Sequence, residues 1–431
     1  MTAEQFLEQA GASGVRVRTV DDRVIWDGPA SGTVKPQGPL AGRRVALVVA
    51  AEFSDFQMYH LVEYLSELGA TVELVGVEGP VWKNTRHTDA RKGVQGLWGL
   101  SIDPIPVLGT ARSVYRSLER ATGEPYDAAI VLGGHSADIL MNETGVHDLL
   151  RRTAESGGVL GAIGEGMLPL ISAGLVQGRA CTGNNVVSYL LERVGSFRDE
   201  PVVRDNGLVT ARDTVDTPLL VREIARSFDP NFTDPREGIL AGKRLVIVSG
   251  EDFEDIELVA PVLELLYRGA EITLATFPAP LRSRPPLLGL DMVMGNFGVS
   301  VPLQEIPRKR YEIAPLPEID PGQPDVVMIP GAFCPWNMVR AATPVEWLRK
   351  ADAAGTTIAA ICHGAIPLSA AGLVEGKVLA GVGQCRSHVD VMGGSYRGDY
   401  SAVVDGRIVS GRVPPDVPEF LDAITYRALV G

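Results

Sequence analysis

A cysteine and a histidine stand side by side in a sharp turn, Ile361-Cys362-His363-Gly364. The apolar run 357–361 before it is typical of a buried strand, and Gly364 and Pro367 suit the start of a helix. Such a turn places the Cys362 sulfur near a helix N-terminus, where free N–H groups and the helix dipole favour the thiolate. The sequence therefore predicts a nucleophilic cysteine able to attack a carbonyl carbon. The competing interpretation is a small core cysteine.

A near copy of this segment occurs earlier in the chain without the nucleophile. Residues 159–178 read VLGAIGEGMLPLISAGLVQG and residues 357–376 read TIAAICHGAIPLSAAGLVEG, so Gly164 and Glu165 replace Cys362 and His363. The chain therefore contains two related domains, and the first is predicted to be catalytically inactive. The expected organisation is an N-terminal extension (1–40), a first domain (41–226), a linker (227–240) and a second, catalytic domain (241–431).

Each copy alternates short apolar strands with helices. The strands at 45–50 and 245–248 are each followed by a helix that ends at Gly69 or Gly269, where glycine provides the left-handed cap. This alternation predicts a parallel sheet covered by helices on both faces, with ligands beyond the carboxyl ends of the strands.

A second glycine loop is expected at the same edge of the catalytic sheet. Gly331 and Ala332 follow an apolar strand, and their backbone N–H groups, with that of His363, are candidates to stabilise an oxyanion. Trp336 is expected to narrow the pocket beside this loop and to favour a small or flat substrate.

The second domain resembles the ThiJ/PfpI superfamily, which is related to the class I glutamine amidotransferase fold. The resemblance rests on residues 245–261, 329–331, 360–364, 371–376 and 408–414. It implies two tandem flavodoxin-like, three-layer α/β/α domains with mainly parallel sheets. It also implies that Cys362 is the nucleophile and that Glu257 lies beside its sulfur.

Glu257 would act as a proton carrier under this hypothesis. A carboxyl that loses its solvation next to a thiolate has a raised pKa, so it can stay protonated, hydrogen-bond the sulfur and transfer a proton. The alternative is a solvated glutamate at a helix start, favoured by the dipole. In the first copy Gln57 aligns with Glu257, so that copy lacks the acid as well as the nucleophile.

An acidic residue that orients the histidine is expected from the first copy. In the peptidase-like branch of the superfamily, a neighbouring subunit donates this acid a few positions after the glycine loop. That position is Trp336 in the second copy and Asp138 in the first. We therefore expect an intrachain pseudo-dimer with one composite site of Cys362, His363 and Asp138, with His135 in the same loop. The alternative is that Asp138 caps a helix.

Composition excludes several classes of protein. The formal charge is −13 and no long basic run is present, so nucleic-acid binding is not expected. The start of the chain lacks the pattern of a signal peptide, and its apolar runs are too short to span a bilayer, which predicts a cytoplasmic protein. The four cysteines show no zinc spacing, so no metal and no cofactor are predicted.

These features predict a cysteine-dependent enzyme whose partner is a small carbonyl substrate. A glyoxalase III-like reaction through a covalent Cys362 adduct is the leading interpretation, and the tandem layout resembles tandem glyoxalases of the superfamily. The alternatives are a hydratase, amidohydrolase or lyase of secondary metabolism, an intracellular cysteine peptidase, and a non-enzymatic redox sensor or chaperone. The sequence leaves open whether the pseudo-dimers associate further into homo-oligomers. The long segments 82–124 and 277–324 are expected to cover the site or form interfaces.

Overall fold

The chain divides into two compact units, and we describe each by itself. One unit comprises residues 30–234, and the other comprises residues 1–29 together with 235–431. The computed structural model describes residues 1–12, 16–27, 37–77, 94–98, 113–121, 123, 125–278 and 293–431. Much of the two long segments singled out from the sequence, namely 82–93, 99–112, 122, 124 and 279–292, lies outside these residues.

The first domain is built on a mainly parallel sheet. In the described residues its strand order is β10-β11-β7-β6-β3-β4-β5, and only the β10–β11 pair is antiparallel. These strands are β3 (Arg44–Ala50), β4 (Thr71–Val77), β5 (Ser113–Ser117), β6 (Ala128–Val131), β7 (Val159–Ile163), β10 (Val202–Asp205) and β11 (Leu208–Ala211). The short strands β8 (Ala180–Cys181) and β9 (Ser196–Phe197) pair with each other.

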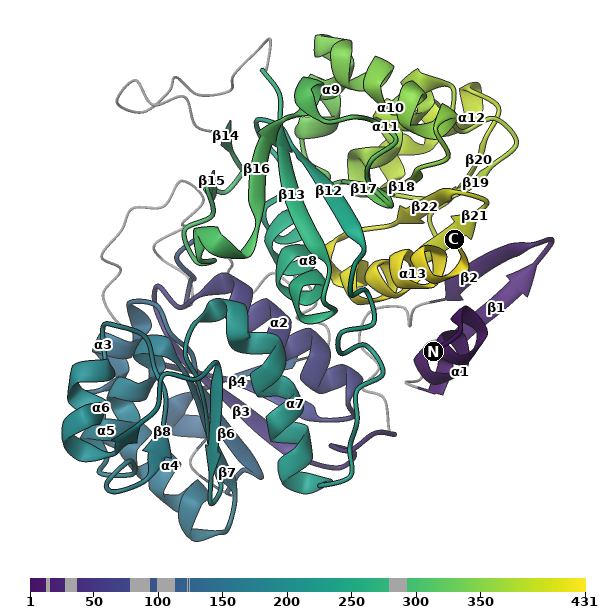
Figure 1. The fold of residues 1–431 in the computed structure, drawn as a ribbon. Helices are drawn as coiled ribbons and strands as arrows, with labels where there is room; N and C mark the ends of the chain where they lie inside the picture. Colours follow the sequence, from purple (N-terminus) through teal and green to yellow (C-terminus); the bar gives the residue numbers. More distant parts are fainter. Residues whose placement is uncertain are drawn as a thin grey trace. The chain divides into compact units, whose positions relative to one another are not determined.

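Helices cover both faces of this sheet, as its continuously apolar strands require. Helices α2 and α7 pack together on one face, and α3, α4 and α5 lie on the other (Figure 1). Their bounds are α2 (Asp55–Glu67), α3 (Ser136–Leu140), α4 (Thr144–Glu155), α5 (Met167–Ser172), α6 (Ser188–Val194) and α7 (Thr217–Phe228). A buried apolar core that includes Val48, Val131 and Leu160 fills the space between layers.

The second domain repeats this plan and adds strands at one edge. Its sheet, in the described residues, has the order β1-β2-β21-β22-β18-β17-β12-β13-β16. The strands that follow the repeat are β12 (Arg244–Ser249), β13 (Glu271–Thr276), β16 (Glu312–Pro315), β17 (Val326–Ile329), β18 (Thr357–Ile361), β21 (Ala402–Asp405) and β22 (Ile408–Gly411). The strands from β22 to β16 are parallel to one another. Two further pairs are β14 (Val293–Met294) with β15 (Ser300–Val301), and β19 (Val378–Ala380) with β20 (Ser395–Arg397).

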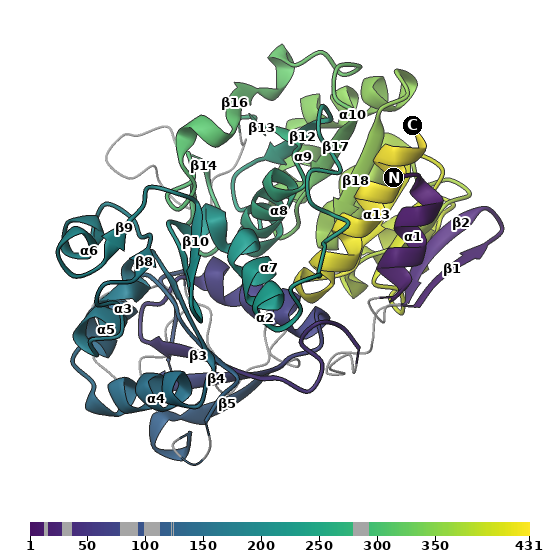
Figure 2. The same cartoon turned by 60° about the horizontal axis from the view of Figure 1, so that its bottom comes forward.

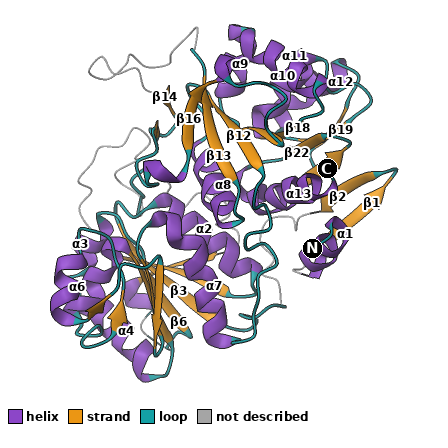
Figure 3. Cartoon of the chain, viewed as in Figure 1, coloured by secondary structure: helices purple, strands orange, loops and turns teal. Residues whose placement is uncertain are grey.

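The helices of the second domain again form two outer layers, which Figure 3 shows in purple around the orange strands. Helices α8 and α13 lie on one face of the sheet, and α9, α10 and α11 lie on the other. The bounds are α8 (Asp255–Tyr267), α9 (Cys334–Ala341), α10 (Thr343–Ala353), α11 (Ala365–Ala371), α12 (Arg386–Val391) and α13 (Val417–Val430). Gly69 and Gly269, with φ of 100° and 86°, follow α2 and α8 in the cap position that the sequence predicts.

The N-terminal residues belong to the second domain. Helix α1 (Ala3–Ala12) lies beside α13, and strands β1 (Arg16–Val20) and β2 (Arg23–Asp27) form a hairpin (Figure 2). Strand β2 pairs antiparallel with β21, so the hairpin extends the sheet. Ile25 packs into a small cluster with Ala380, Tyr400 and Val403. Of the predicted N-terminal extension, residues 1–40, the part up to residue 29 therefore lies in the same compact unit as the second domain.

The predicted fold class is confirmed, because both domains are α/β units with mainly parallel sheets in tandem. In the segment predicted to be the linker, residues 227–240, helix α7 continues to Phe228. The boundary between the two compact units falls at Asp234 and Pro235. Among the described helices, none combines the length and apolar composition that crossing a bilayer requires.

Candidate active site

Cys362 occupies a strained turn at the carboxyl end of β18. Its φ is +58°, a left-handed conformation that costs a non-glycine residue free energy and is typical of functional sites. One turn of 3₁₀ helix, Cys362–Gly364, leads into α11. Gly364 is required by close packing, since an added Cβ would lie 2.9 Å from the Ile329 oxygen. The turn therefore holds the sulfur at the sheet edge, as the sequence predicts for an elbow.

The Gly331–Ala332 loop encloses the sulfur from the neighbouring strand. A Cβ on Gly331 would meet Glu257 Oε2 at 2.5 Å, Cys362 Cβ at 2.7 Å and Cys362 Sγ at 2.9 Å. Only glycine fits at this position without moving those groups. Ala332 has φ of +55°, and its N–H, like that of His363, donates a hydrogen bond to the sulfur. These two donors are placed to stabilise negative charge that develops at the reacting atoms.

Glu257 comes from the first turn of α8 and is fully buried. The N–H of Gly331 donates to its Oε2 at 2.7 Å, and the Cys362 thiol also hydrogen-bonds this carboxyl. Glu254 caps the helix by accepting a hydrogen bond from Glu257 N at 2.6 Å. The cap and the glycine loop together fix the carboxyl beside the sulfur.

Burial dominates the electrostatics of this pair. It raises the pKa of Glu257 to about 8, although hydrogen bonds from Gly331 and Cys362 oppose the shift. Burial and the nearby Glu257 carboxyl also raise the pKa of the Cys362 thiol, while the His363 and Ala332 N–H groups lower it. The helix N-terminus was expected to favour the thiolate, but burial outweighs it. A proton is therefore retained by Glu257 at neutral pH, where it is available for transfer.

His363 lies next to the sulfur. Its Nδ1 is 3.3 Å from Cys362 Sγ, and partial burial lowers the pKa of the imidazole. The ring is therefore neutral at physiological pH and can accept a proton. Cys362 keeps 7% of its surface exposed, so only a small reacting group reaches the sulfur.

Stability should depend on pH through Glu257. Its folded pKa of about 8 is above the ordinary value of 4.5, so the folded state binds more protons and stability falls as pH rises between these values. Glu257→Gln removes the titrating carboxyl and with it this contribution to the pH dependence of stability. We expect the melting temperature of the wild type, relative to Glu257→Gln, to fall steadily from pH 5 to pH 9 in thermal denaturation. A difference that does not change with pH would contradict a raised pKa.

A second cysteine lies closer to the elbow than the sequence suggests. The Cys385 thiol donates a hydrogen bond to the Cys362 carbonyl oxygen at 3.3 Å, and burial raises its pKa to about 12. Its position 23 residues after the elbow gives no signal of this contact. Cys334, in contrast, is fully buried, and a Cβ added to Gly250 would lie 2.9 Å from its sulfur. Both are free thiols.

The other predicted residues take places in their own domains. Trp336 is half-buried on α9, and its ring meets that of His388 edge-on with centroids 5.2 Å apart. In the first domain, His135 Nδ1 pairs with Glu52 Oε2 at 2.8 Å. Asp138 is exposed in the first turn of α3, where no side-chain cap forms.

The role of Asp138 in orienting His363 stays a prediction. If Asp138 holds the imidazole, Asp138→Asn should lower turnover by about tenfold or more, because the amide no longer stabilises the correct tautomer and the cation. Its melting temperature should be unchanged, because the side chain is exposed in its domain. Steady-state kinetics of Asp138→Asn and of the exposed control Asp148→Asn test this expectation. Equal turnover in both variants would refute it.

The first domain fills the corresponding site with other groups. Gly133 N donates to Gln57 Oε1 at 2.8 Å, and Gln57 Nε2 donates to Thr214 Oγ1 at 2.9 Å. Gly164 keeps the left-handed turn with φ of +53° but has no side chain. Glu165 accepts a hydrogen bond from Asn184 at 2.7 Å. The amide, the glycine and this carboxylate preserve the shape of the site without a nucleophile.

The fold defines a tandem α/β protein in which the second domain carries a cysteine at the strained turn and the first carries a glycine there. The model of the DJ-1/PfpI family matches residues 43–227 and 243–426, so the chain belongs to the DJ-1/PfpI family and contains two copies of its domain. The resemblance inferred from the sequence is thereby confirmed.

Similar proteins include both tandem and single-domain members. Protein DJ-1 homolog D of Arabidopsis thaliana is 24% identical over 315 residues, covering 71% of this chain and 78% of that protein. Deglycase PfpI of Pyrococcus furiosus is 27% identical over 175 residues, covering 40% and 92%. Protein/nucleic acid deglycase 2 of Escherichia coli is 27% identical over 186 residues, covering 43% and 96%. The crystal structure of Drosophila melanogaster DJ-1beta is similar with a TM-score of 0.36 and 20% identity, covering 43% and 90%.

Proposed function

We propose that the second domain is a cysteine-dependent enzyme that acts on a small carbonyl compound through a covalent adduct on Cys362. The observation that carries this proposal is the placement of the fully buried Glu257 carboxyl and the Cys362 sulfur against the same glycine, Gly331, with His363 Nδ1 3.3 Å from that sulfur. Burial raises the pKa of Glu257 to about 8, which favours its protonated form. The similarity to deglycases supports this class of chemistry.

A glyoxalase III-like reaction uses each of these groups. The Cys362 sulfur bonds to the aldehyde carbon of methylglyoxal, and the carbonyl oxygen takes up a proton through Glu257, which gives a hemithioacetal. The N–H groups of Ala332 and His363 stabilise the transient oxyanion. His363 then removes the proton from the former aldehyde carbon and returns it to the neighbouring carbonyl carbon, while the hydroxyl proton moves to the neighbouring oxygen. The product is a lactoyl thioester.

Water completes the cycle. Its oxygen attacks the thioester carbon and gives up one proton to His363. The bond to sulfur then breaks, the sulfur takes a proton from Glu257, and the proton from His363 restores the Glu257 carboxyl as lactic acid leaves. The sum is one methylglyoxal and one water to one lactic acid, with no external oxidant or reductant. The 7% exposure of Cys362 favours a substrate as small as this one.

Incubation with methylglyoxal in the absence of glutathione tests the proposal. Loss of the carbonyl and appearance of lactate should both be catalysed by the wild type and absent in Cys362→Ser. Cys385→Ser is the matched control, because Cys385 is buried and its thiol donates to the backbone oxygen of Cys362, a hydrogen bond that a serine hydroxyl can also make. Methylglyoxal consumption that is equal in the wild type and Cys362→Ser would refute the proposal for this substrate. If glyoxal, other small aldehydes and glycated amines also show no Cys362-dependent loss, the enzyme class itself is refuted.

A further inference from the structure

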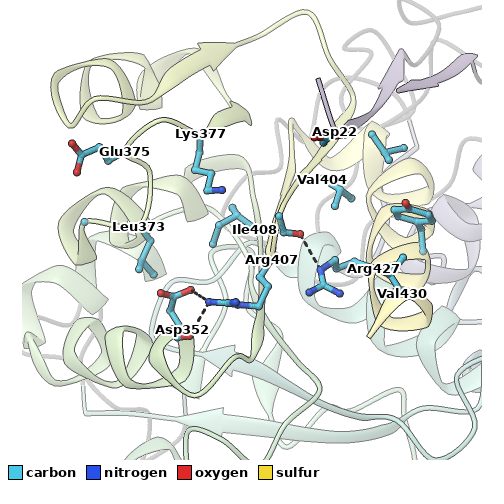
Figure 4. A pocket seen from close by; sticks show the side chains of 14 residues that line it. Asp22, Asp352, Leu373, Glu375, Lys377, Val404, Arg407, Ile408, Arg427 and Val430 are labelled. Atoms are coloured by element: carbon cyan, nitrogen blue, oxygen red, sulfur yellow. Dashed lines mark hydrogen bonds and ion pairs between the residues drawn. The ribbon is translucent and has the colours of Figure 1, made fainter. Parts of the chain in front are cut away.

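A cavity of about 760 Å³ lies in the second domain at the amino ends of its parallel strands, away from the edge that carries Cys362. Figure 4 shows side chains that reach it from α10, α13, the segment before β19 and the turn between β21 and β22. The N-terminal hairpin contributes Asp22 and Val24. Cavities of this size hold small metabolites. The proposed reaction at Cys362 makes no use of it.

Arg427 presents a buried cation to this cavity. Only 8% of the residue is exposed, and its guanidinium points into the space in Figure 4. Nε donates to the Gly406 carbonyl oxygen at 2.9 Å. Nη1 is buried, and within the described residues no acceptor pairs with it. The carboxylate that normally accompanies a buried guanidinium is therefore missing from the described surroundings.

The neighbouring Arg407 adds positive charge beside Arg427. Arg407 repels Arg427, and this repulsion, after the larger effect of burial, lowers the pKa of Arg427. Arg407 is itself anchored by Asp352, whose carbonyl oxygen and Oδ1 each lie 3.2 Å from Nη2. Lys377 is paired with Asp405 at 3.2 Å. Two guanidinium groups thus face one space, and only one of them has a carboxylate partner among the described residues.

The remaining lining is partly acidic and partly apolar. Asp22 and Glu375 reach the cavity as well, and Glu375 points away from the two arginines in Figure 4. Leu373, Ile408 and Tyr426 supply apolar wall. A ligand that fits has one anionic group for the arginines and an apolar body for these walls.

We propose that this cavity binds a small organic anion whose carboxylate or phosphate group pairs with Arg427 and Arg407. Binding would place an anionic acceptor against the part of the Arg427 guanidinium that lines the cavity, which offsets the cost of burying a cation without a carboxylate partner. The proposal is independent of the reaction at Cys362 and survives if that reaction is refuted.

Thermal denaturation of the full chain with matched small molecules tests the charge requirement. Benzoate has the anionic group and an apolar body, benzamide has the same body without the charge, and inorganic phosphate has the charge alone. We expect a saturable rise in melting temperature with benzoate, a smaller saturable rise with phosphate and none with benzamide, at ionic strength fixed with sodium chloride. Equal effects of benzoate and benzamide, or effects of benzoate and phosphate no larger than those of sodium chloride, would overturn the proposal.

Two variants place the effect at this cavity. Arg427→Met keeps most of the side-chain volume and should abolish the benzoate shift, with a ligand-free melting temperature equal to or above that of the wild type, since an unpaired buried charge is removed. Arg407→Gln should weaken benzoate binding about tenfold, as loss of one charge-assisted contact does. Lys350→Met removes an exposed cation outside the cavity lining and should leave the shift intact.

The variants also show what would refute the site. A benzoate shift that persists in both Arg427→Met and Arg407→Gln would exclude this cavity. A ligand-free melting temperature of Arg427→Met well below the wild type would show that the guanidinium also stabilises the fold through Gly406, and Arg407→Gln then decides whether the site exists. If Arg427→Met does not fold, the half-exposed Arg407→Gln still decides, because wild-type affinity in that variant refutes the site.

Discussion

Glu257→Gln is expected to lower kcat/KM of the Cys362-dependent reaction by about 10²- to 10⁴-fold, the usual contribution of a positioned general acid–base group. Burial holds the carboxyl in its protonated form, with a pKa of about 8, in contact with the sulfur. An amide of the same shape can still accept the Gly331 N–H but cannot transfer a proton. The loss should therefore fall on chemistry, and kcat should decrease while KM changes little.

The first domain shows that the fold tolerates this substitution. Gln57 occupies the same place and accepts the equivalent glycine N–H, from Gly133, at 2.8 Å. The matched control is Glu346→Gln, which changes an exposed carboxyl on α10 to an amide. Stopped-flow and steady-state kinetics of the wild type and both variants measure the changes in kcat and KM. Retention of kcat/KM within about twofold in Glu257→Gln, with wild-type folding, would remove Glu257 from the mechanism.

Gly331→Ala should lower activity at the same site by displacing the catalytic side chains. The added Cβ would lie 2.5 Å from Glu257 Oε2 and 2.9 Å from Cys362 Sγ, well inside van der Waals contact. Either the carboxyl or the sulfur must move by a good part of an ångström, and misplacement of about 1 Å can cost about 10²-fold in rate. We expect that loss in kcat/KM, together with a decrease of about 1–3 kcal/mol in the free energy of unfolding from overpacking. Denaturant unfolding and kinetics measure the two effects.

The equivalent substitution in the first domain is the control for this prediction. Gly133→Ala would place a Cβ 2.9 Å from the Ile163 oxygen and 3.0 Å from Glu165 Oε2, a crowding that is similar in kind. It should destabilise the protein to a comparable extent but leave the chemistry at Cys362 intact. Activity losses of equal size in the two glycine variants would mean that Gly331 acts through stability alone.

The sequence predicts the parts of the site that depend on local geometry. The caps at Gly69 and Gly269 follow from the backbone preference of glycine, whereas the elbow at Cys362 and the loop at Gly331 follow from the order of apolar strand, small-residue turn and helix along the chain. The repeat adds information, because the comparison of Gln57 with Glu257 identifies the carboxyl as the changed group. These predictions depend only on the residue types next to each position in the sequence and on the parallel arrangement of the strands.

Contacts between distant segments escape this reasoning. Nothing in the spacing indicates that Cys385 reaches the Cys362 carbonyl oxygen or that the Cys334 sulfur lies close to Gly250. The balance between the helix dipole and burial at Cys362 also depends on how completely the domain encloses the sulfur. Such features are set by the packing of loops, whose paths side-chain patterns do not determine.

The N-terminal hairpin sets an order for folding. Arg23 pairs with Asp405 at 2.6 Å across 382 positions of sequence, and β2 completes its hydrogen bonds only on β21. Strands β1 and β2 must therefore wait, as a hairpin that is marginal alone, until β21 has also been synthesised. An intact first domain emerges and can fold during this interval. The second domain therefore completes its sheet after the first domain has been synthesised, and a chain that begins after the first copy would leave the β21 edge without its covering strand.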